Sequence, residues 1–507
     1  MGVHTPEDQM RAAGVSESKV GAMVAKKPLS SDVSGSAKDE VQAVVEEFNS
    51  RFMVVNEAGK AIIYAPGFDQ ILKRRVFNRM TFDDFRRLYM NRLIRVGTDD
   101  KGNAVWKTAA TVWLQHRERR QFTGGVVFDP SGSRQPDDVL NLWNGFAVNP
   151  APGDWSLLLE HIKTIICAGD PERLRYLMGW LAQMMQRPAE QGEVAVVMRG
   201  GEGTGKGTVA RAAMHILGSH GLAISNSKHL VGNFNGHLRD AVFLFADEAF
   251  FAGDKASIGV LKSLITEPYL TVESKFQNAV QMPNFLHVMM ASNEEWVVPA
   301  SQDARRFFVL EVAETRKNDH AYFVRISKQM DAGGYEAMLH DLLKFDLTGF
   351  NVRAVPVTEG LQTQRKLSLP PAELWWKDCL ERGYVFRSRL GLEEIFGKWC
   401  EEASTELLFA SYIEFAKERH ERHPMSRETI GRFLVRMGLR PKRLANAPVG
   451  EHSVESISGY GGTGRTAKAN IQSRAPGYRL GTLPAARASF SDATKLQIRW
   501  PDEGIEE

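Results

Sequence analysis

Cysteine is scarce in this chain, and its spacing excludes two common uses of clustered thiols. The 507 residues include three cysteines, Cys167, Cys379 and Cys400, and no two of them form a CxxC pair. This pattern argues against a disulfide framework and against a zinc ribbon. It is typical of a protein that works in a reducing cytoplasm.

Long apolar runs are missing as well, and so is a strong excess of charge. No apolar run reaches the length of a membrane span, and the chain does not open with a basic and then apolar leader. We therefore expect a soluble protein with no membrane partner. The formal net charge is only +3, so any surface that binds nucleic acid must be local.

Aromatic residues are absent before Phe48, and residues 1–40 are rich in Ser, Ala, Gly and Lys. This composition predicts a disordered arm. Residues 41–150 predict a small α+β domain, in which Arg51–Val55 and Lys60–Tyr64 form a hairpin. This domain lacks catalytic acids at the spacing of a polymerase, so we do not expect a fused primase.

A glycine-rich loop follows the strand-like run Val194–Met198. Residues 199–208 read RGGEGTGKGT, the pattern of a phosphate-binding loop, and Val209–Leu217 can form the helix that leaves it. Backbone N–H groups of such a loop close around phosphate oxygens, and the helix N-terminus adds positive potential. The predicted ATP cradle consists of Gly200, Gly201, Glu202, Gly203, Thr204, Gly205, Lys206, Gly207 and Thr208.

One position departs from the pattern. Gly207 stands where Ser or Thr usually holds Mg²⁺, and the hydroxyl comes one residue later, at Thr208. Either Thr208 or a water molecule then contacts the metal. The run GKGT also occurs in adenylate kinases, so the loop alone does not separate a nucleotide kinase from a motor.

Adjacent carboxylates end the second apolar run, Ala241–Ala246. Asp247 is suited to hold the metal through its water shell, and Glu248 is suited to polarise the attacking water as general base. A third run, Phe285–Ala291, leads to Asn293, whose amide can orient water and sense the γ-phosphate.

A fourth run, Phe307–Val312, follows Arg305 and Arg306. This arginine pair either lies at a solvated edge or supplies positive charge to the ATP of a neighbouring subunit. Of the two, Arg306 is slightly preferred as the residue that contacts that ATP. Four strands that carry their polar groups at one end match the rule that ligands bind at the C-terminal ends of parallel strands.

Together, Lys206, the pair Asp247–Glu248 and Asn293 resemble motifs A, B and C of superfamily 3 helicases. These proteins are an AAA+ branch of viral and phage replication motors. The resemblance extends over about residues 154–312, and it is greatest to the helicase domain of phage primase-polymerases and of poxvirus-type primase-helicases. It implies ATP and Mg²⁺ as cofactors and the cytoplasm of a bacterial host.

The segment Leu270–Gln281 resembles the β-hairpin that these helicases carry between motifs B and C. In papillomavirus-type helicases the hairpin tip carries a Lys and a neighbouring ring residue, and Lys275 and Phe276 match those positions. The resemblance implies that both side chains contact DNA in the channel of a ring.

The remaining segments complete the predicted organisation. Residues 151–190 form a helical collar that includes a helix over Pro171–Gln186, residues 191–315 the AAA+ core, and residues 316–370 a helical segment and linker. Residues 371–507 resemble a winged helix, with helices over Ser404–His423 and Arg427–Met437 and returning strands at Gly477–Leu480 and Leu496–Trp500. Its predicted DNA contacts are Arg427, Arg432 and Arg436.

These patterns predict an α/β protein with a P-loop AAA+ core and a parallel sheet, flanked by the α+β domain and collar and by the winged-helix-like domain. We expect an ATP-dependent DNA helicase of phage or prophage replication. It would act as a homo-hexameric ring on single-stranded and forked DNA, with a separate primase or polymerase. The rivals are an ATP-switched initiator or loader, which binds DNA without unwinding it, and a nucleotide kinase.

Overall fold

The chain folds into two units in the computed structural model, which describes residues 37–70, 74–226, 235–248, 255–273, 279–298, 305–385, 399–449 and 470–501. The first unit comprises Met1–Val298 and Arg305–Thr358, and the second comprises Pro299–Ala304 and Glu359–Glu507. Residues 1–36 of the predicted arm lie outside the described residues, and so do Lys275 and Phe276. Within the described ranges, every helix is too short or too polar to span a lipid bilayer.

The first unit begins with an α+β part, in which the predicted hairpin is confirmed. Strands β1 and β2 pair antiparallel from Met53 opposite Tyr64 to Glu57 opposite Lys60. The turn between them places Ala58 and Gly59 at positive φ. The elements of this part are α3 (Ala37–Arg51), β1 (Met53–Glu57), β2 (Lys60–Asp69), β3 (Arg74–Met80), α4 (Phe82–Leu88), β4 (Leu93–Thr98), β5 (Ala104–Thr108), α5 (Ala109–Gln115), β6 (Gln121–Phe122), β7 (Gly125–Val127) and β8 (Val139–Asn141).

Two helical segments precede the central sheet. The helix predicted over Pro171–Gln186 is confirmed as α7, with those bounds. Asp170 caps it by accepting hydrogen bonds from the backbone N–H groups of the first turn. The segment before it is less regular than expected, since α6 (Ser156–His161) continues as a π-helical turn, η1 (Ile162–Ile166).

A five-stranded parallel sheet forms the centre of the first unit, so the predicted α/β class with a parallel sheet is confirmed. Its order is β10-β11-β14-β9-β15. The strands are β9 (Ala195–Arg199), β10 (Gly221–Ile224), β11 (Phe243–Asp247), β14 (His287–Ser292) and β15 (Phe307–Glu311). Four of them, β9, β11, β14 and β15, are almost wholly buried, which explains why each reads as a continuous apolar run.

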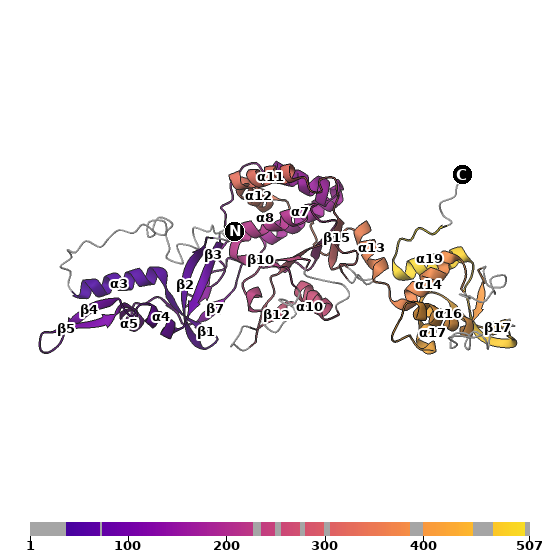
Figure 1. Cartoon of the computed structure of the whole chain (residues 1–507), viewed down its shortest axis with the longest axis horizontal. Coiled ribbons are helices and arrows are strands. Elements are labelled where there is room, and N and C mark those ends of the chain that lie inside the picture. Colours follow the sequence, from indigo (N-terminus) through magenta and orange to yellow (C-terminus); the bar gives the residue numbers. More distant parts are fainter. Residues whose placement is uncertain are drawn as a thin grey trace. The chain divides into compact units, whose positions relative to one another are not determined.

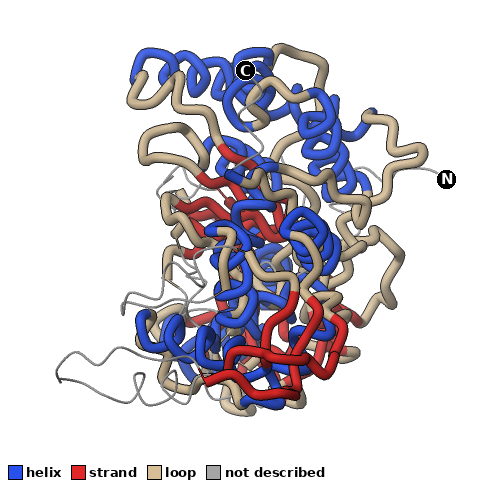
Figure 2. The backbone as a smooth tube through the Cα atoms, turned by 90° about the vertical axis from the view of Figure 1, so that its right-hand side faces the viewer, coloured by secondary structure: helices blue, strands red, loops and turns tan. Residues whose placement is uncertain are grey.

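Helices cover both faces of this sheet (Figure 1; strands are red in Figure 2). Helices α7, α8, α11 and α12 lie on one face and α10 on the other. The bounds are α8 (Gly207–Leu217), α10 (Lys255–Thr266), α11 (His320–Gln329) and α12 (Tyr335–Lys344). Short turns of other helix types are η2 (Gly218–His220), η3 (Gly236–Leu238) and η4 (Met330–Gly334).

The hairpin predicted between Asp247 and Asn293 is confirmed in its two strands. Strands β12 (Tyr269–Val272) and β13 (Val280–Pro283) pair antiparallel, from Tyr269 opposite Pro283 to Val272 opposite Val280.

Buried polar contacts join the α+β part to the sheet. Arg239 donates hydrogen bonds to Glu57 and to the Tyr64 hydroxyl, and Glu57 is only 5% exposed. His220 donates from Nδ1 to the Asp240 carbonyl at 2.7 Å, and its Nε2 accepts from the backbone N–H of Asn144 at 3.0 Å. These bonds explain why both parts belong to one unit.

The second unit has its own core, around Trp375, Trp376, Tyr412 and Phe433. Its antiparallel sheet has the order β16-β18-β17. The elements are α13 (Glu359–Leu367), α14 (Pro371–Arg382), β16 (Glu402–Ser404), α16 (Thr405–Glu418), α17 (Arg427–Arg436), β17 (Arg440–Val449), β18 (Asn470–Arg479) and α19 (Leu483–Thr494).

Two expectations for the second unit are wrong in detail. The first helix ends at Glu418, before the predicted His423, because the chain turns into the left-handed region at His420. Residues 496–500 form no strand, since Leu496 and Trp500 are buried in the core without pairing to the sheet. The strand predicted around Gly477 is confirmed as the end of β18.

Candidate nucleotide site

The glycine-rich loop lies between β9 and α8, in the strand–loop–helix context that the sequence predicts. Gly203 and Gly205 adopt positive φ values of 75° and 85°, which L side chains rarely adopt. The loop therefore needs glycine at these two positions.

Lys206 folds back over this loop. Its Nζ donates to the backbone carbonyl of Gly200 at 2.8 Å and to that of Gly201 at 2.7 Å. Burial lowers the pKa of the Lys206 ammonium, and the negative charges of Glu248 and Asp247 oppose this shift. The cation thus sits over the loop, where a phosphate group would compete with the two carbonyls for it.

The acidic pair lies at the same edge of the sheet as the loop. Asp247 is the last residue of β11 and lies opposite Ala291 of β14. The next residue of β14, Ser292, lies opposite Arg199 at the end of β9. Glu248 has a φ of +54°, and its N–H donates to the Ala291 carbonyl at 2.9 Å. A non-glycine residue in this region costs about 1–3 kcal/mol, and such strain concentrates at functional sites.

An open cavity of about 970 Å³ joins these groups. Lys206, Thr208, Asp247 and Glu248 line one side of it. The other side is formed by residues of α6, α11, η4 and α12, including Leu158, Phe323, Val324, Ser327, Met330 and Tyr335. The lining therefore combines a cation and carboxylates with apolar side chains, which suits a nucleotide.

The oxygen groups at the cationic end fit Mg²⁺. The Thr208 hydroxyl and the carboxylates of Asp247 and Glu248 are hard oxygen ligands, and Mg²⁺ usually binds through one or two carboxylates together with substrate phosphates. Among the described residues, no cluster of three or more His, Cys, Asp or Glu side chains forms a metal site independent of a nucleotide.

The loop residues Gly200, Gly201 and Thr204 do not line the cavity, and neither do the three predicted catalytic residues that follow the other strand runs. Asn293 follows β14 at the correct edge of the sheet, but it is exposed and lies outside the lining. Arg305 and Arg306 precede β15, and the Arg306 carbonyl accepts from the N–H of Ala195 at the start of β9. The expectation that all four runs carry their polar groups at one end is therefore wrong for β15, whose arginines lie at the opposite edge of the sheet from Lys206.

Residues that the sequence did not single out hold the loop from behind. His161 of α6 contacts the Gly205 carbonyl through Nε2 at 3.3 Å, and the Tyr322 hydroxyl of α11 lies 3.3 Å from its Nδ1. Burial lowers the pKa of His161 to about 4, so the ring is neutral near pH 7. The consistent arrangement has Tyr322 donating to Nδ1 and Nε2–H donating to Gly205. No spacing signal reveals these partners, because they lie 161 residues apart.

Gly205 also packs against this support. A Cβ at Gly205 would lie 2.4 Å from the Phe323 ring and 2.8 Å from the His161 ring. The loop thus rests directly on α6 and α11.

Helix α17 of the second unit carries the predicted DNA contacts. Its apolar residues Ile430, Phe433 and Leu434 are buried, as the spacing predicts. Arg427 pairs with Glu406 at 3.7 Å, whereas Arg436 donates at 2.7 Å to Glu373, which is 5% exposed. Burial raises the pKa of Glu373, and Arg436 opposes that shift.

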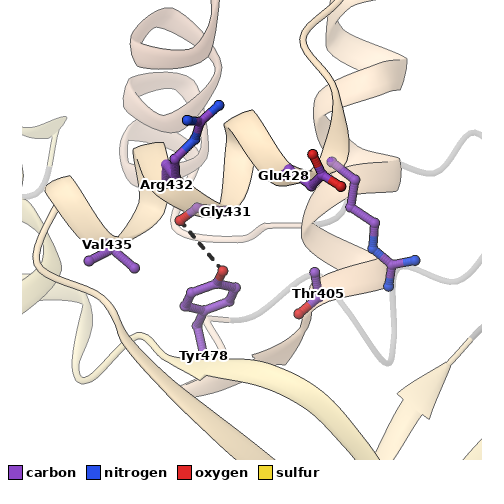
Figure 3. Close-up of a pocket in the computed structure, with 7 residues that line it drawn as sticks. Thr405, Glu428, Gly431, Arg432, Val435 and Tyr478 are labelled. Carbon is purple, nitrogen blue, oxygen red and sulfur yellow. Dashed lines mark hydrogen bonds between the residues drawn. The ribbon is translucent and has the colours of Figure 1, made fainter.

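The outer face of α17 borders a shallow cavity of about 580 Å³ (Figure 3). Gly431 lies at its centre, and its carbonyl accepts a long hydrogen bond, 3.5 Å, from the Tyr478 hydroxyl of β18. Arg432 and Val435 flank Gly431 on the same helix. This surface is concave and carries a cation and an aromatic ring.

Comparisons with known proteins point to phage replication proteins. A family model described as a family of unknown function (DUF5906) matches residues 198–306. The DNA primase-polymerase of Nitratiruptor phage NrS-1 is 25% identical over 205 residues, which are 39% of this chain and 27% of that protein. The chain thus spans about a quarter of the length of this curated relative.

Solved structures of the C-terminal region of the same phage protein were also matched, and one of them shows a shared fold. An apo structure of the NrS-1 C-terminal region has a TM-score of 0.55 at 15% identity, covering 80% of this chain and 96% of that one. An A-form apo structure of the region gives 0.49 at 17% identity, covering 65% and 75%. This chain is homologous to part of the NrS-1 primase-polymerase and has the fold of its C-terminal region.

Proposed function

We propose that this chain is an ATP-hydrolysing DNA motor of phage or prophage replication, of the superfamily 3, AAA+ helicase type. The observation that carries the proposal is the convergence of Lys206, Asp247 and Glu248 on one cavity at the C-terminal edge of a parallel sheet. A replication role is further supported by homology to a phage primase-polymerase.

Each group at this edge has a role in the proposal. The loop from Gly200 to Thr208 binds the phosphates of ATP, and Lys206 neutralises their charge. Thr208 and Asp247 would hold Mg²⁺, which adds charge neutralisation when it is bound. Glu248 accepts the proton of the attacking water, and Asn293 orients that water from the neighbouring strand end.

The arginine pair supports an ATP site shared between subunits. Each residue of a parallel strand rises about 3.3 Å, so the five residues of β9 separate the Arg306 end of the sheet from the loop by about 16 Å. Arg305 and Arg306 therefore serve the ATP of a neighbouring copy in a homo-hexameric ring.

The proposed DNA contacts come from two places. Lys275 and Phe276 lie outside the described residues, in the segment between β12 and β13, and in the proposal they contact single-stranded DNA in the ring channel. In the second unit, the described order of helix, strand, helix, helix and two paired strands supports a winged helix as the proposed DNA-binding fold. Its α17 would contact forked or duplex DNA through Arg427 and Arg432.

The deciding experiment measures strand separation and ATP hydrolysis on a forked duplex. Wild type should hydrolyse ATP faster with single-stranded DNA and should unwind the fork. Glu248→Gln should bind ATP but not turn it over, because the proton acceptor is lost. Lys275→Ala combined with Phe276→Ala should remove DNA stimulation and unwinding, since a stacked base contributes about 1–3 kcal/mol.

The outcomes separate the rival functions. ATP hydrolysis and DNA binding without any unwinding by wild type would identify an initiator or loader. Phosphate transfer from ATP to a nucleoside monophosphate would identify a kinase. Normal turnover by Glu248→Gln would show that another group activates the water.

A further inference from the structure

An arginine occupies the space that the missing hydroxyl residue of the phosphate loop leaves free. A Cβ built on Gly207 would lie 2.5 Å from Nη1 of Arg211, with the Phe245 ring next at 3.6 Å. Arg211 lies four residues further along α8, so both residues share one face of the helix. Helical side chains lean toward the N-terminus, which brings this guanidinium back over the start of α8.

Arg211 is exposed, and it forms part of the lining of the nucleotide cavity. It lines the cavity together with Lys206 and Asp247, and its Nη2 lies 3.3 Å from the Thr208 hydroxyl, to which it donates. Among the described residues, Arg211 has no carboxylate partner within 4.0 Å. Within the described part of the chain, its charge is therefore not neutralised by an ion pair.

The placement of this charge, folded back toward the N-terminal end of α8, favours a bound anion. The N-terminus of an α-helix carries a partial positive charge, and a cation in the first turns is destabilising there. Lys206 already supplies one cation at this end of α8, and Arg211 adds a second. An anion with several oxygens, such as the phosphate chain of a nucleotide, would stabilise both.

We propose that Arg211 contacts the phosphates of the bound nucleotide directly and takes over part of the charge neutralisation that Mg²⁺ supplies in loops with a hydroxyl at this position. The inference rests on the proposed nucleotide site. A guanidinium forms strong charge-assisted hydrogen bonds to phosphate oxygens. Nucleotide binding to this chain consequently depends less on divalent cations than the loop pattern alone predicts.

The test is binding of ADP to the full chain by calorimetry, in Mg²⁺ and in EDTA. Wild type should bind in both conditions, with affinities within about tenfold of each other, because the guanidinium remains when the metal is removed. Arg211→Ala should lose about tenfold or more in EDTA and less in Mg²⁺, and Arg211→Lys should lie between. The matched control is Arg325→Ala, which removes an exposed arginine of α11 that does not line the cavity.

Gly207→Ala gives an independent route to the same result. A Cβ at this position is normal in phosphate loops, so it should not block the nucleotide, but it should displace the Arg211 guanidinium. It should therefore reproduce the EDTA-specific loss of Arg211→Ala. The double variant Gly207→Ser with Arg211→Ala restores the usual pattern, and it should bind ADP well in Mg²⁺ and poorly in EDTA.

The nucleotide site and the role of Arg211 are refuted by different results. If wild type does not bind ADP in Mg²⁺, or if Lys206→Ala binds as wild type does, the nucleotide site itself is wrong. If Lys206→Ala abolishes binding while folded Arg211→Ala and Gly207→Ala match wild type in EDTA, the role of Arg211 is wrong. Loss of all wild-type binding in EDTA would overturn it as well.

Discussion

The support of the phosphate loop by His161 leads to a prediction that links stability to nucleotide binding. The substitution His161→Phe keeps a buried ring of similar size but removes both hydrogen bonds, to the Gly205 carbonyl and from the Tyr322 hydroxyl. His161 is fully buried, and without it the Gly205 carbonyl keeps only the backbone N–H of Thr208, at 3.0 Å, as a donor. Each of the two lost hydrogen bonds contributes about 0.5–1.5 kcal/mol, so we expect the free energy of unfolding of the first unit to fall by about 1–3 kcal/mol.

The same substitution should weaken nucleotide binding, because Gly205 directly precedes Lys206. If about 1 kcal/mol of the lost stabilisation belongs to the loop conformation that binds ADP, the Kd for ADP rises about fivefold. Tyr322→Phe removes one bond and leaves Gly205 paired, so its effect on the Kd should be smaller. His161→Gln retains an N–H donor at a similar reach and should recover part of the affinity.

Urea unfolding and ADP titration near pH 7.5 measure the two effects separately. Wild-type stability together with wild-type ADP affinity in His161→Phe would refute the reasoning. A stability loss without any change in ADP affinity would show that His161 supports the packing of α6 but does not hold the loop.

Further predictions concern pH, subunit exchange and the second unit. Burial lowers the pKa of His161 and His287 to about 4 from 6.5, so only the unfolded chain takes up these protons, and urea unfolding should show stability falling between pH 6.5 and 4 by about 3 kcal/mol per histidine. A flat profile would contradict this. Mixing the inactive Arg305/Arg306 double variant with Lys206→Ala should restore some ATP hydrolysis, and none after demonstrated exchange would oppose a shared site. Arg432→Ala should weaken salt-dependent DNA binding, whereas Arg436→Ala should chiefly lower thermal stability by leaving Glu373 unpaired.

The parts of the fold that the sequence predicts are those with local or periodic signals. Strands β9, β11, β14 and β15 are buried on both faces, so each reads as an unbroken apolar run. Helix α7 carries an Asp-Pro start and a helical spacing of apolar residues, and both bounds agree with the prediction. The loop at Lys206 has a fixed pattern between such a strand and a helix, which makes its place in the fold predictable.

Features that depend on distant partners were not predictable in this way. Nothing in the spacing places His161 and Tyr322 together behind the loop, or Arg239 against Glu57. The role of Arg436 likewise depends on the buried Glu373, 63 residues away. Helix α17 therefore shows the expected periodicity, but only the structure separates an arginine paired with the core from one that is directed outward.

The position of Arg305 and Arg306, at the other end of the strands from the one expected, has a consequence for assembly. A parallel sheet has two chemically different edges, and here the loop and Asp247 lie at one, whereas Arg305 and Arg306 lie at the other. Groups at opposite edges of one rigid sheet cannot act on the same nucleotide. In the proposed ring, the arginines of one copy would meet the loop of the next when copies associate head to tail. Such contacts are heterologous, and they close into a ring when the rotation between neighbours divides a full turn. In the proposed motor, the polarity of the strands thus makes each subunit complete the site of the next.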